Sequence, residues 1–219
     1  FIGGHGNSIG GIIVDGRTFH WSKSGKYPLP SQPRPEYNGL KLHETFGNFA
    51  FAIAARVIGL RDLGPALSPF NAFLILTGIE TLSLRVQRHS DNAKAVAEWL
   101  SANPAVAWVS YAGLPGDRYH NLARKYSPKG AGAVFTFGLK GGYDAGISLV
   151  SNVRLFSHLA NVGDTRSLII HPASTTHSQL DDAQKALAGA GVDVVRLSVG
   201  IEDKEDLIAD LEQALAVHG

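Results

Sequence analysis

The sequence of 219 residues contains no cysteine and no methionine. Without cysteine, the chain can form neither a disulfide bond nor a thiolate zinc site, and it has no cysteine nucleophile. It also lacks any unbroken run of about 18 apolar residues, so no transmembrane helix is predicted. No basic segment followed by an apolar one opens the sequence, and we therefore expect a cytoplasmic protein.

A surplus of charge of either sign is also lacking. Twenty lysine and arginine residues stand against nineteen aspartate and glutamate residues, which leaves a net charge of +1. This balance gives no global field for holding DNA, RNA or an anionic membrane. Hydrophobic residues make up 44% of the sequence, so the chain can bury a sizeable core and is not predicted to be disordered.

The first part of the sequence mixes strand, loop and helix patterns. Residues 9–14 are largely β-branched, which predicts a strand. Residues 19–46 combine prolines with aromatic residues, which predicts an irregular loop packed onto another part of the molecule or onto a partner subunit. Apolar residues at helical spacing then predict a helix that begins near Gly47 and stops at Gly59.

A long helix is predicted next. Ser68 and Pro69 form a start signal, in which a capping hydroxyl is followed by proline in the first turn. Helix-forming residues then continue nearly to Asn103. Because this is long for one globular helix, we expect a bend or a break at Gly78 or within residues 88–91. Such a helix is suited to connecting two domains.

After residue 104, short strand and helix patterns alternate, which predicts an α/β or α+β fold. The last helical segment has its apolar residues on one face, Asp203 at the N-cap position and Asp206 in the first turn. Strands are predicted at residues 106–111, 133–139 and 192–199, a short apolar run lies at residues 168–170, and helices are predicted at residues 119–126, 144–160, 179–190 and 205–217.

Ser8 is the first candidate for chemistry. It lies in Gly6-Asn7-Ser8-Ile9-Gly10, which matches the G-x-S-x-G nucleophile elbow of serine hydrolases. The elbow needs a strand before the serine and a helix after it, whereas here glycines precede Ser8 and β-branched residues follow it. A turn that lets the backbone approach a ligand or another backbone closely is the stronger interpretation of the glycines.

His171 and His177 enclose a run of three hydroxyl residues, Ser174, Thr175 and Thr176. The two histidines have no acidic residue between them and no cysteine nearby, so we predict no metal site. The hydroxyl groups suit hydrogen bonds to a bound anion, and they equally suit the internal bonds of a turn. The sequence leaves both interpretations open.

Arg196 lies between apolar residues of a predicted strand. Period-two alternation places Val195 and Leu197 on one face of that strand and Arg196 on the other. An arginine in this setting needs an anion, because burying an unpaired charge is costly, and its planar fork fits a carboxylate. A ligand and an internal acid such as Asp193 or Glu202 are equally compatible with the sequence.

Four stretches of the sequence resemble motifs of the pyridoxal-phosphate enzymes of cysteine and methionine metabolism. They are residues 1–11, 84–93, 160–177 and 196–203. The third stretch carries Asn161-Val162-Gly163 where cystathionine synthases and lyases of the family tend to have serine-leucine-glycine, and it resembles the O-acetylhomoserine sulfhydrylase branch. The resemblance runs through nearly the whole sequence in the same order.

The resemblance implies the C-terminal half of a fold-type I subunit, of the α/β class. Residues 1–85 would form the end of the large cofactor-binding domain and a connecting helix, and residues 86–219 the small C-terminal α/β domain. The Schiff-base lysine would immediately precede Phe1, so no catalytic residue is expected within this sequence. We therefore expect the sequence to start inside a longer chain, which fits its opening without methionine.

The resemblance also implies pyridoxal 5'-phosphate as cofactor and a γ-replacement reaction. O-acetyl-L-homoserine and sulfide, or methanethiol, would give L-homocysteine, or L-methionine, and acetate. Arg196 would bind the substrate α-carboxylate, Asn161 would donate a hydrogen bond to it, and Ser174 and Thr176 would line the pocket. A homotetramer is implied. A cystathionine γ-synthase or methionine γ-lyase reaction is the alternative within the family, and a serine hydrolase or a non-catalytic binding module outside it.

Overall fold

A computed structural model describes residues 1–217 of the protein. The chain divides into two compact units, one made of Phe1–Ser8 and Leu74–Gly219 and the other of Ile9–Phe73. In the described part of the chain, no helix combines the length and the apolar character needed to cross a membrane. The predicted division into domains at residue 85 concerns the complete subunit and stays a prediction.

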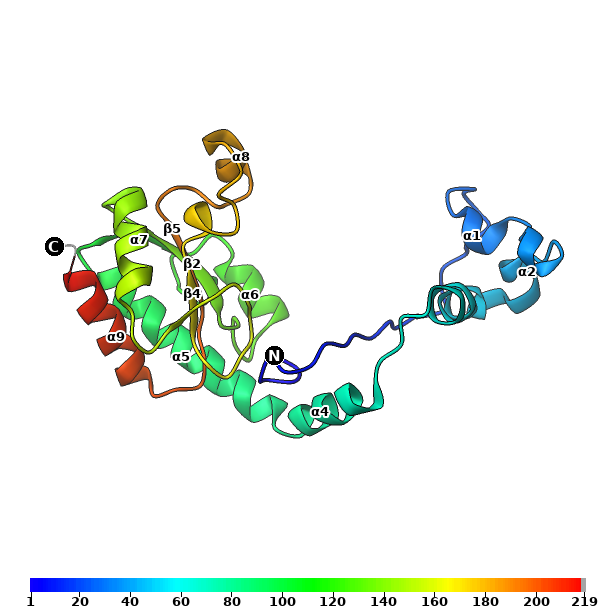
Figure 1. The fold of residues 1–219 in the computed structure, drawn as a ribbon, viewed down its shortest axis with the longest axis horizontal. Coiled ribbons are helices and arrows are strands. Elements are labelled where there is room, and N and C mark those ends of the chain that lie inside the picture. Colours follow the sequence, from blue (N-terminus) through cyan, green and yellow to red (C-terminus); the bar gives the residue numbers. More distant parts are fainter. Residues whose placement is uncertain (218–219) are drawn as a thin grey trace. The chain divides into compact units, whose positions relative to one another are not determined.

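The larger unit is built around a five-stranded mixed sheet in the order β1-β2-β5-β4-β3 (Figure 1). Strand β5 lies in the middle of the sheet and is antiparallel to both β2 and β4, whereas β3 is parallel to β4. Strands and helices together confirm the predicted α/β class. The strands are β1 (Val106–Ser110), β2 (Val134–Leu139), β3 (Ser157–His158), β4 (Leu168–Ile170) and β5 (Val194–Ser198).

One face of the sheet is covered by three helices, α5 (Leu82–Ala102), α7 (Gly142–Asn152) and α9 (Lys204–Ala216) (Figure 1). Val195 and Leu197 of β5 are completely buried in the core between sheet and helices. Because side chains alternate along a strand, Arg196 lies on the opposite face. The predicted alternation of this strand is thus confirmed.

Helix α7 ends at Asn152, whereas the sequence predicts a helix that continues to residue 160. The carboxylate of Asp210 in α9 accepts hydrogen bonds from the backbone N–H groups of residues 154–156, at 2.8, 2.8 and 3.1 Å. These three N–H groups therefore donate to Asp210 and not to helix carbonyls, and the chain leaves the helix and turns toward β3. At the start of α9, the Asp203 carboxylate accepts from the Glu205 N–H (3.3 Å), which confirms the predicted cap.

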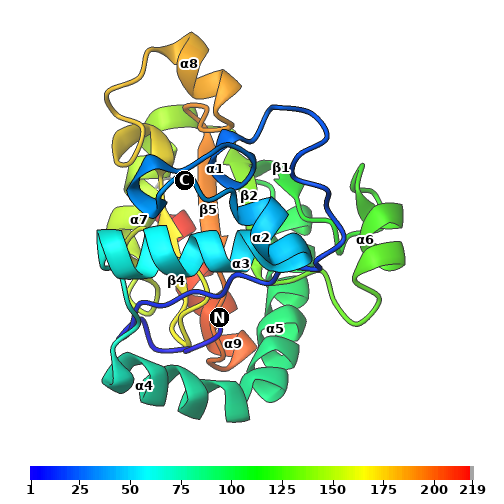
Figure 2. The same ribbon diagram turned by 90° about the vertical axis from the view of Figure 1, so that its right-hand side faces the viewer.

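Two further helices flank the sheet (Figure 2). Helix α6 (His120–Tyr126) agrees with its prediction, whereas α8 (Asp182–Leu187) is shorter than the predicted residues 179–190. A capping box between Asp181 and Gln184 sets the start of α8. After its end, Gly189 adopts a left-handed conformation (φ 69°) that the helix cannot continue through.

The predicted long helix is split into α4 (Pro69–Glu80) and α5. The hydroxyl of Ser68 accepts a hydrogen bond from the backbone N–H of the third residue of α4 (3.0 Å), which confirms the start signal. The break falls at Thr81, close to Gly78, and the alternative break within residues 88–91 is wrong. Within that stretch, Arg88 and His89 have partners in the segment beside α5, the carbonyls of Glu202 (3.1 Å) and Val199 (2.6 Å).

The proline-rich loop of the smaller unit packs onto a helix of the same unit. The ring of Trp21 stacks on Phe51 with centroids 5.2 Å apart, and the rings of Phe19 and Tyr27 meet Trp21 edge-on. Contact with a partner subunit stays a prediction. The short helices of this unit are α1 (Pro28–Ser31), η1 (Pro35–Tyr37), α2 (Leu42–Phe46), η2 (Gly47–Phe49), α3 (Ala50–Ala54) and η3 (Ala55–Leu63).

Two predictions for the smaller unit are wrong. Residues 9–14 are extended and exposed, but among the described residues no strand pairs with them. The helical segment does not stop at Gly59, because the π-helical η3 runs through it to Leu63 and is terminated by Gly64 in a left-handed conformation (φ 90°).

Candidate active site

Arg196 occupies the centre of the sheet on the face opposite the three packed helices. Its register partners are Thr136 of β2 and Ile170 of β4. The side chain is half-buried. Its guanidinium forms no hydrogen bond and no ion pair with any other residue that the structure describes. A half-buried cation without a partner is a ready receptor for an anion from outside the chain.

The two internal acids that the sequence offers as partners for Arg196 are engaged elsewhere. The Asp193 carboxylate accepts a hydrogen bond from Trp108 Nε1 (2.8 Å). The Glu202 carboxylate accepts from the backbone N–H (2.6 Å) and the hydroxyl (2.9 Å) of Ser167. The internal-pair interpretation of Arg196 is therefore wrong for this structure, and the ligand interpretation gains its main support.

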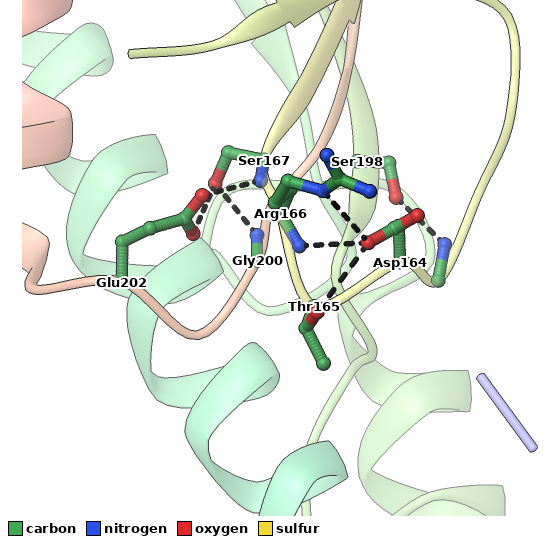
Figure 3. Close-up of polar contacts among 8 residues, drawn as sticks. Asp164, Thr165, Arg166, Ser167, Ser198, Gly200 and Glu202 are labelled. Carbon is green, nitrogen blue, oxygen red and sulfur yellow. Dashed lines mark hydrogen bonds and ion pairs between the residues drawn. The ribbon is translucent and has the colours of Figure 1, made fainter. Parts of the chain in front are cut away.

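Asn161 lies on the loop between β3 and β4, and this loop is fastened to β5 beside Arg196. The Gly163 N–H donates to the hydroxyl of Ser198 (2.9 Å), which shares the sheet face of Arg196 two residues further along β5 (Figure 3). Asn161 itself is exposed, and its Oδ1 accepts from the Val162 N–H (2.9 Å). Its amide nitrogen donates to no described residue and can serve a ligand.

The same loop is held at its other end by a buried network (Figure 3). Ser167 is completely buried, and its hydroxyl accepts from the Gly200 N–H (2.7 Å) while it donates to Glu202. Asp164, also buried, accepts from the Arg166 N–H (3.0 Å). Since all of these bonds link the loop to itself or to the chain just after β5, the positions of Asn161 and Arg196 are coupled.

The glycine-rich opening of the chain packs against this loop. Gly4 and Gly6 have positive φ angles of 84° and 61°. The Gly4 carbonyl accepts from the Thr165 N–H (2.8 Å), and a Cβ on Gly6 would lie only 3.0 Å from an Asp164 carboxylate oxygen. The turn interpretation is confirmed. Ser8 is followed by extended chain and not by a helix, so the nucleophile elbow is not formed.

Three buried polar residues of α5 hold the opening segment and the segment after β5, namely Arg85, His89 and Asn92. Sequence reasoning assigned none of them a role. The signal was available, because residues 85, 89 and 92 share one face of a helix at the spacing that normally carries apolar side chains. Arg85 donates to the carbonyls of Phe1 (2.7 Å) and Ile2 (3.0 Å), His89 Nδ1 to that of Val199 (2.6 Å), and Asn92 to those of Gly200 (3.1 Å) and Glu202 (2.8 Å).

Burial lowers the pKa of His89 below its ordinary value of 6.5. The hydrogen bond to Val199 opposes this effect, the nearby Arg85 charge adds to it, and Glu202 opposes it weakly. His89 is thus neutral in the folded protein and protonated more readily in the unfolded chain. Its contribution to stability is complete above pH 6.5 and is lost as the pH falls below that value.

We expect the melting temperature to fall as the pH is lowered from about 7 to about 5, partly because of this histidine. In a His89→Gln variant the same fall should be shallower, since the variant has no group there to protonate. Thermal melts of both proteins across the range measure the difference. Parallel curves for the two proteins would show that His89 contributes nothing.

Ser174 and Thr176 lie on the turn that follows β4. The Ser174 hydroxyl is 2.9 Å from His171 Nδ1, and His171 is completely buried with Nε2 donating to the Val192 carbonyl (2.8 Å). Thr176 is exposed, with its hydroxyl 2.9 Å from His177 Nδ1. Each hydroxyl group therefore has a partner within residues 171–177. The placement of Ser174 and Thr176 in the substrate pocket stays a prediction. No group of three or more potential metal ligands occurs among residues 1–217.

The family model described as "Cys/Met metabolism PLP-dependent enzyme" matches residues 1–216 of the chain. An O-acetyl-L-homoserine sulfhydrylase of Thermus thermophilus is 56% identical over 99% of the chain and 51% of its own length. An O-acetyl-L-homoserine sulfhydrylase of Leptospira meyeri is 51% identical over 98% of the chain and 50% of its own length. A homocysteine synthase of Schizosaccharomyces pombe is 50% identical over 99% of the chain and 51% of its own length.

A solved structure is similar to the chain in both fold and sequence. The crystal structure described as an O-acetylhomoserine (thiol)-lyase of Campylobacter jejuni, which contains a pyridoxyl-lysine monophosphate residue, superposes with a TM-score of 0.83 at 42% identity. The match covers 90% of this chain and 46% of the other. The chain therefore spans about half the length of the proteins it matches.

Proposed function

The chain belongs to the Cys/Met metabolism PLP-dependent enzyme family, and from that premise we propose that the complete protein is an O-acetylhomoserine sulfhydrylase. It would convert O-acetyl-L-homoserine and sulfide to L-homocysteine and acetate, or use methanethiol to form L-methionine. The high identity to relatives named for this activity supports the proposal. The fold is the C-terminal half of a fold-type I enzyme.

The observation that carries the proposal is the unpartnered guanidinium of Arg196. In the proposed reaction it binds the α-carboxylate of O-acetylhomoserine through two parallel hydrogen bonds. The amide nitrogen of Asn161 adds a third bond to the same carboxylate. Since Ser198 ties the Asn161 loop to the strand of Arg196, both donors are in place before the substrate arrives, and little ordering cost remains on binding.

Pyridoxal 5'-phosphate, when bound, supplies an electron sink for negative charge that develops at the α and β carbons of the substrate. The residues of this chain fit a place beside that group. They bond the opening turn to α5 and to the loop before β4, and the half-buried guanidinium of Arg196 has no partner among the described residues. Within the proposal, the lysine that bears the cofactor immediately precedes Phe1, and this chain orients the substrate for it.

The activity is tested with the purified complete protein and O-acetyl-L-homoserine in three arms, containing sulfide, cysteine or no nucleophile. The proposal expects homocysteine and acetate with sulfide, little cystathionine with cysteine, and little 2-oxobutyrate without a nucleophile. Cystathionine as the main product would assign a cystathionine γ-synthase, and 2-oxobutyrate a γ-lyase. Absence of visible absorbance from bound cofactor in the purified protein would contradict all three.

We place the enzyme in the cytoplasm as a homotetramer, as the family resemblance implies. Support for an assembly comes from apolar side chains on α4 that the described residues leave exposed, such as Phe70 (68%) and Leu76 (63%). Light scattering of the complete protein measures the subunit number, and a monomer would contradict the assembly without touching the proposed reaction.

A further inference from the structure

Arg85 is an almost completely buried cation (7% exposed) with no acidic partner among the described residues. Its guanidinium donates only to neutral oxygen atoms. Nη1 donates to the Phe1 carbonyl (2.7 Å), Nη2 to the carbonyls of Ile2 (3.0 Å) and Gly78 (2.7 Å), and Nε to Thr81 Oγ1 (3.3 Å). Buried charges usually have an opposite charge beside them. Here the dipoles of backbone carbonyl groups stabilise the charge in place of an acidic residue. The guanidinium and the backbone around it therefore fix each other's position.

The segment bound to Arg85 is also confined from its other sides. A Cβ on Gly4 would lie 2.7 Å from Arg85 Nη1, and a Cβ on Gly78 of α4 would collide with the Gly3 carbonyl oxygen. The Thr165 N–H donates to the Gly4 carbonyl (2.8 Å). The first four residues are thus held between α4, α5 and the loop before β4. Among the residues that the structure describes, Arg85 is the one whose side chain bonds to two consecutive carbonyls of this segment.

The contacts of Arg85 also join the end of α4 to the first turns of α5. The Gly78 carbonyl is one of the last in α4, where the break at Thr81 leaves it without a helical donor. Arg85 fills that place from the first turns of α5 while it holds the opening segment. A lysine could not do the same, because its single ammonium lacks the planar fork that reaches carbonyls on two segments at once.

We propose that Arg85 is a positioning residue that sets the place of the opening backbone, and with it the reach of the lysine that bears the cofactor. This inference rests on the proposed function, in which that lysine immediately precedes Phe1. Arg85 itself touches neither substrate nor cofactor in this role. It acts through the carbonyls of Phe1 and Ile2 on the residue before them.

The test compares Arg85→Met and Arg85→Lys in the complete enzyme, with Arg124→Met on the exposed helix α6 as the matched control. Four quantities are measured: the affinity for pyridoxal phosphate, the pH at which the visible band of the bound cofactor changes, kcat and KM. In Arg85→Met the dissociation constant of the cofactor should rise by about tenfold or more. The pH of the band change should move, and kcat should fall with KM nearly unchanged because Arg196 is intact. Arg85→Lys should lie between this variant and the wild type, and Arg124→Met should match the wild type.

A purely structural role gives a different result. If the Arg85 variants melt at a lower temperature but keep the wild-type cofactor affinity, band pH and kcat, the proposal is overturned. If Arg85→Met does not fold, Arg85→Lys decides the question by the same three readouts. A wild-type protein that binds no pyridoxal phosphate would overturn the proposed function itself, and the two failures are therefore distinguishable.

Discussion

Replacing Arg196 with alanine in the complete enzyme is expected to raise the KM for O-acetyl-L-homoserine by about a hundredfold or more, since losing one partner of a buried, bidentate charge pair costs several kcal/mol. The bound cofactor should remain visible in the absorption spectrum, because Arg196 forms no hydrogen bond or ion pair with the described residues that follow the proposed cofactor lysine. Steady-state kinetics at varied O-acetylhomoserine, with sulfide saturating, measure the effect.

The arginine series carries its own controls. Arg196→Lys should fall between wild type and Arg196→Ala, because an ammonium keeps the charge but loses the two-bond geometry. Arg118→Ala provides a matched control, since this guanidinium lies over the ring of the neighbouring Tyr119 on the surface. The KM for sulfide should change little in each variant. An unaltered KM for O-acetylhomoserine in Arg196→Ala would remove the carboxylate-binding role and the main structural support for the proposed function.

The placement of Arg196 could be predicted because it depends on a local rule. Alternation along a strand needs no knowledge of partners, and the buried Val195 and Leu197 follow it. The caps at Ser68 and Asp203 are local in the same sense, since each bonds to an N–H within three residues. Motifs that act within one turn or one strand are therefore readable from the sequence.

The partner of Glu202 could not be predicted in this way. Glu202 is close to Arg196 in the sequence, but the end of β5 turns it toward Ser167, which arrives from the far side of the loop before β4. The end of α7 similarly depends on Asp210, more than fifty residues away in the sequence. Residues 9–14 have a strand composition, yet a strand also needs a partner, and none of the described residues supplies one. Contacts between distant segments decide each of these cases.

Glu202→Ala is expected to have the largest effect on stability among the site residues and to weaken substrate binding while Arg196 is still present. The substitution removes the acceptor of both the N–H and the hydroxyl of Ser167, a residue that is completely buried. Leaving two buried donors without a partner costs about 2–5 kcal/mol. The loop that carries Asn161 loses its anchor, so the KM for O-acetylhomoserine should rise together with the loss of stability.

Glu205→Ala isolates the specific effect of Glu202. Both residues are glutamates after β5, but the Glu205 side chain is 71% exposed and its ion pair with Lys204 is long (3.7 Å). Its loss should leave the melting temperature and KM close to those of the wild type, because exposed ion pairs contribute little. In Glu202→Ala, addition of saturating substrate should recover part of the lost melting temperature, since a ligand that binds only the ordered loop stabilises it by mass action. Equal melting temperatures for the two variants would show that the Ser167 network does not hold the loop, and Asn161 would then lose its predicted position beside Arg196.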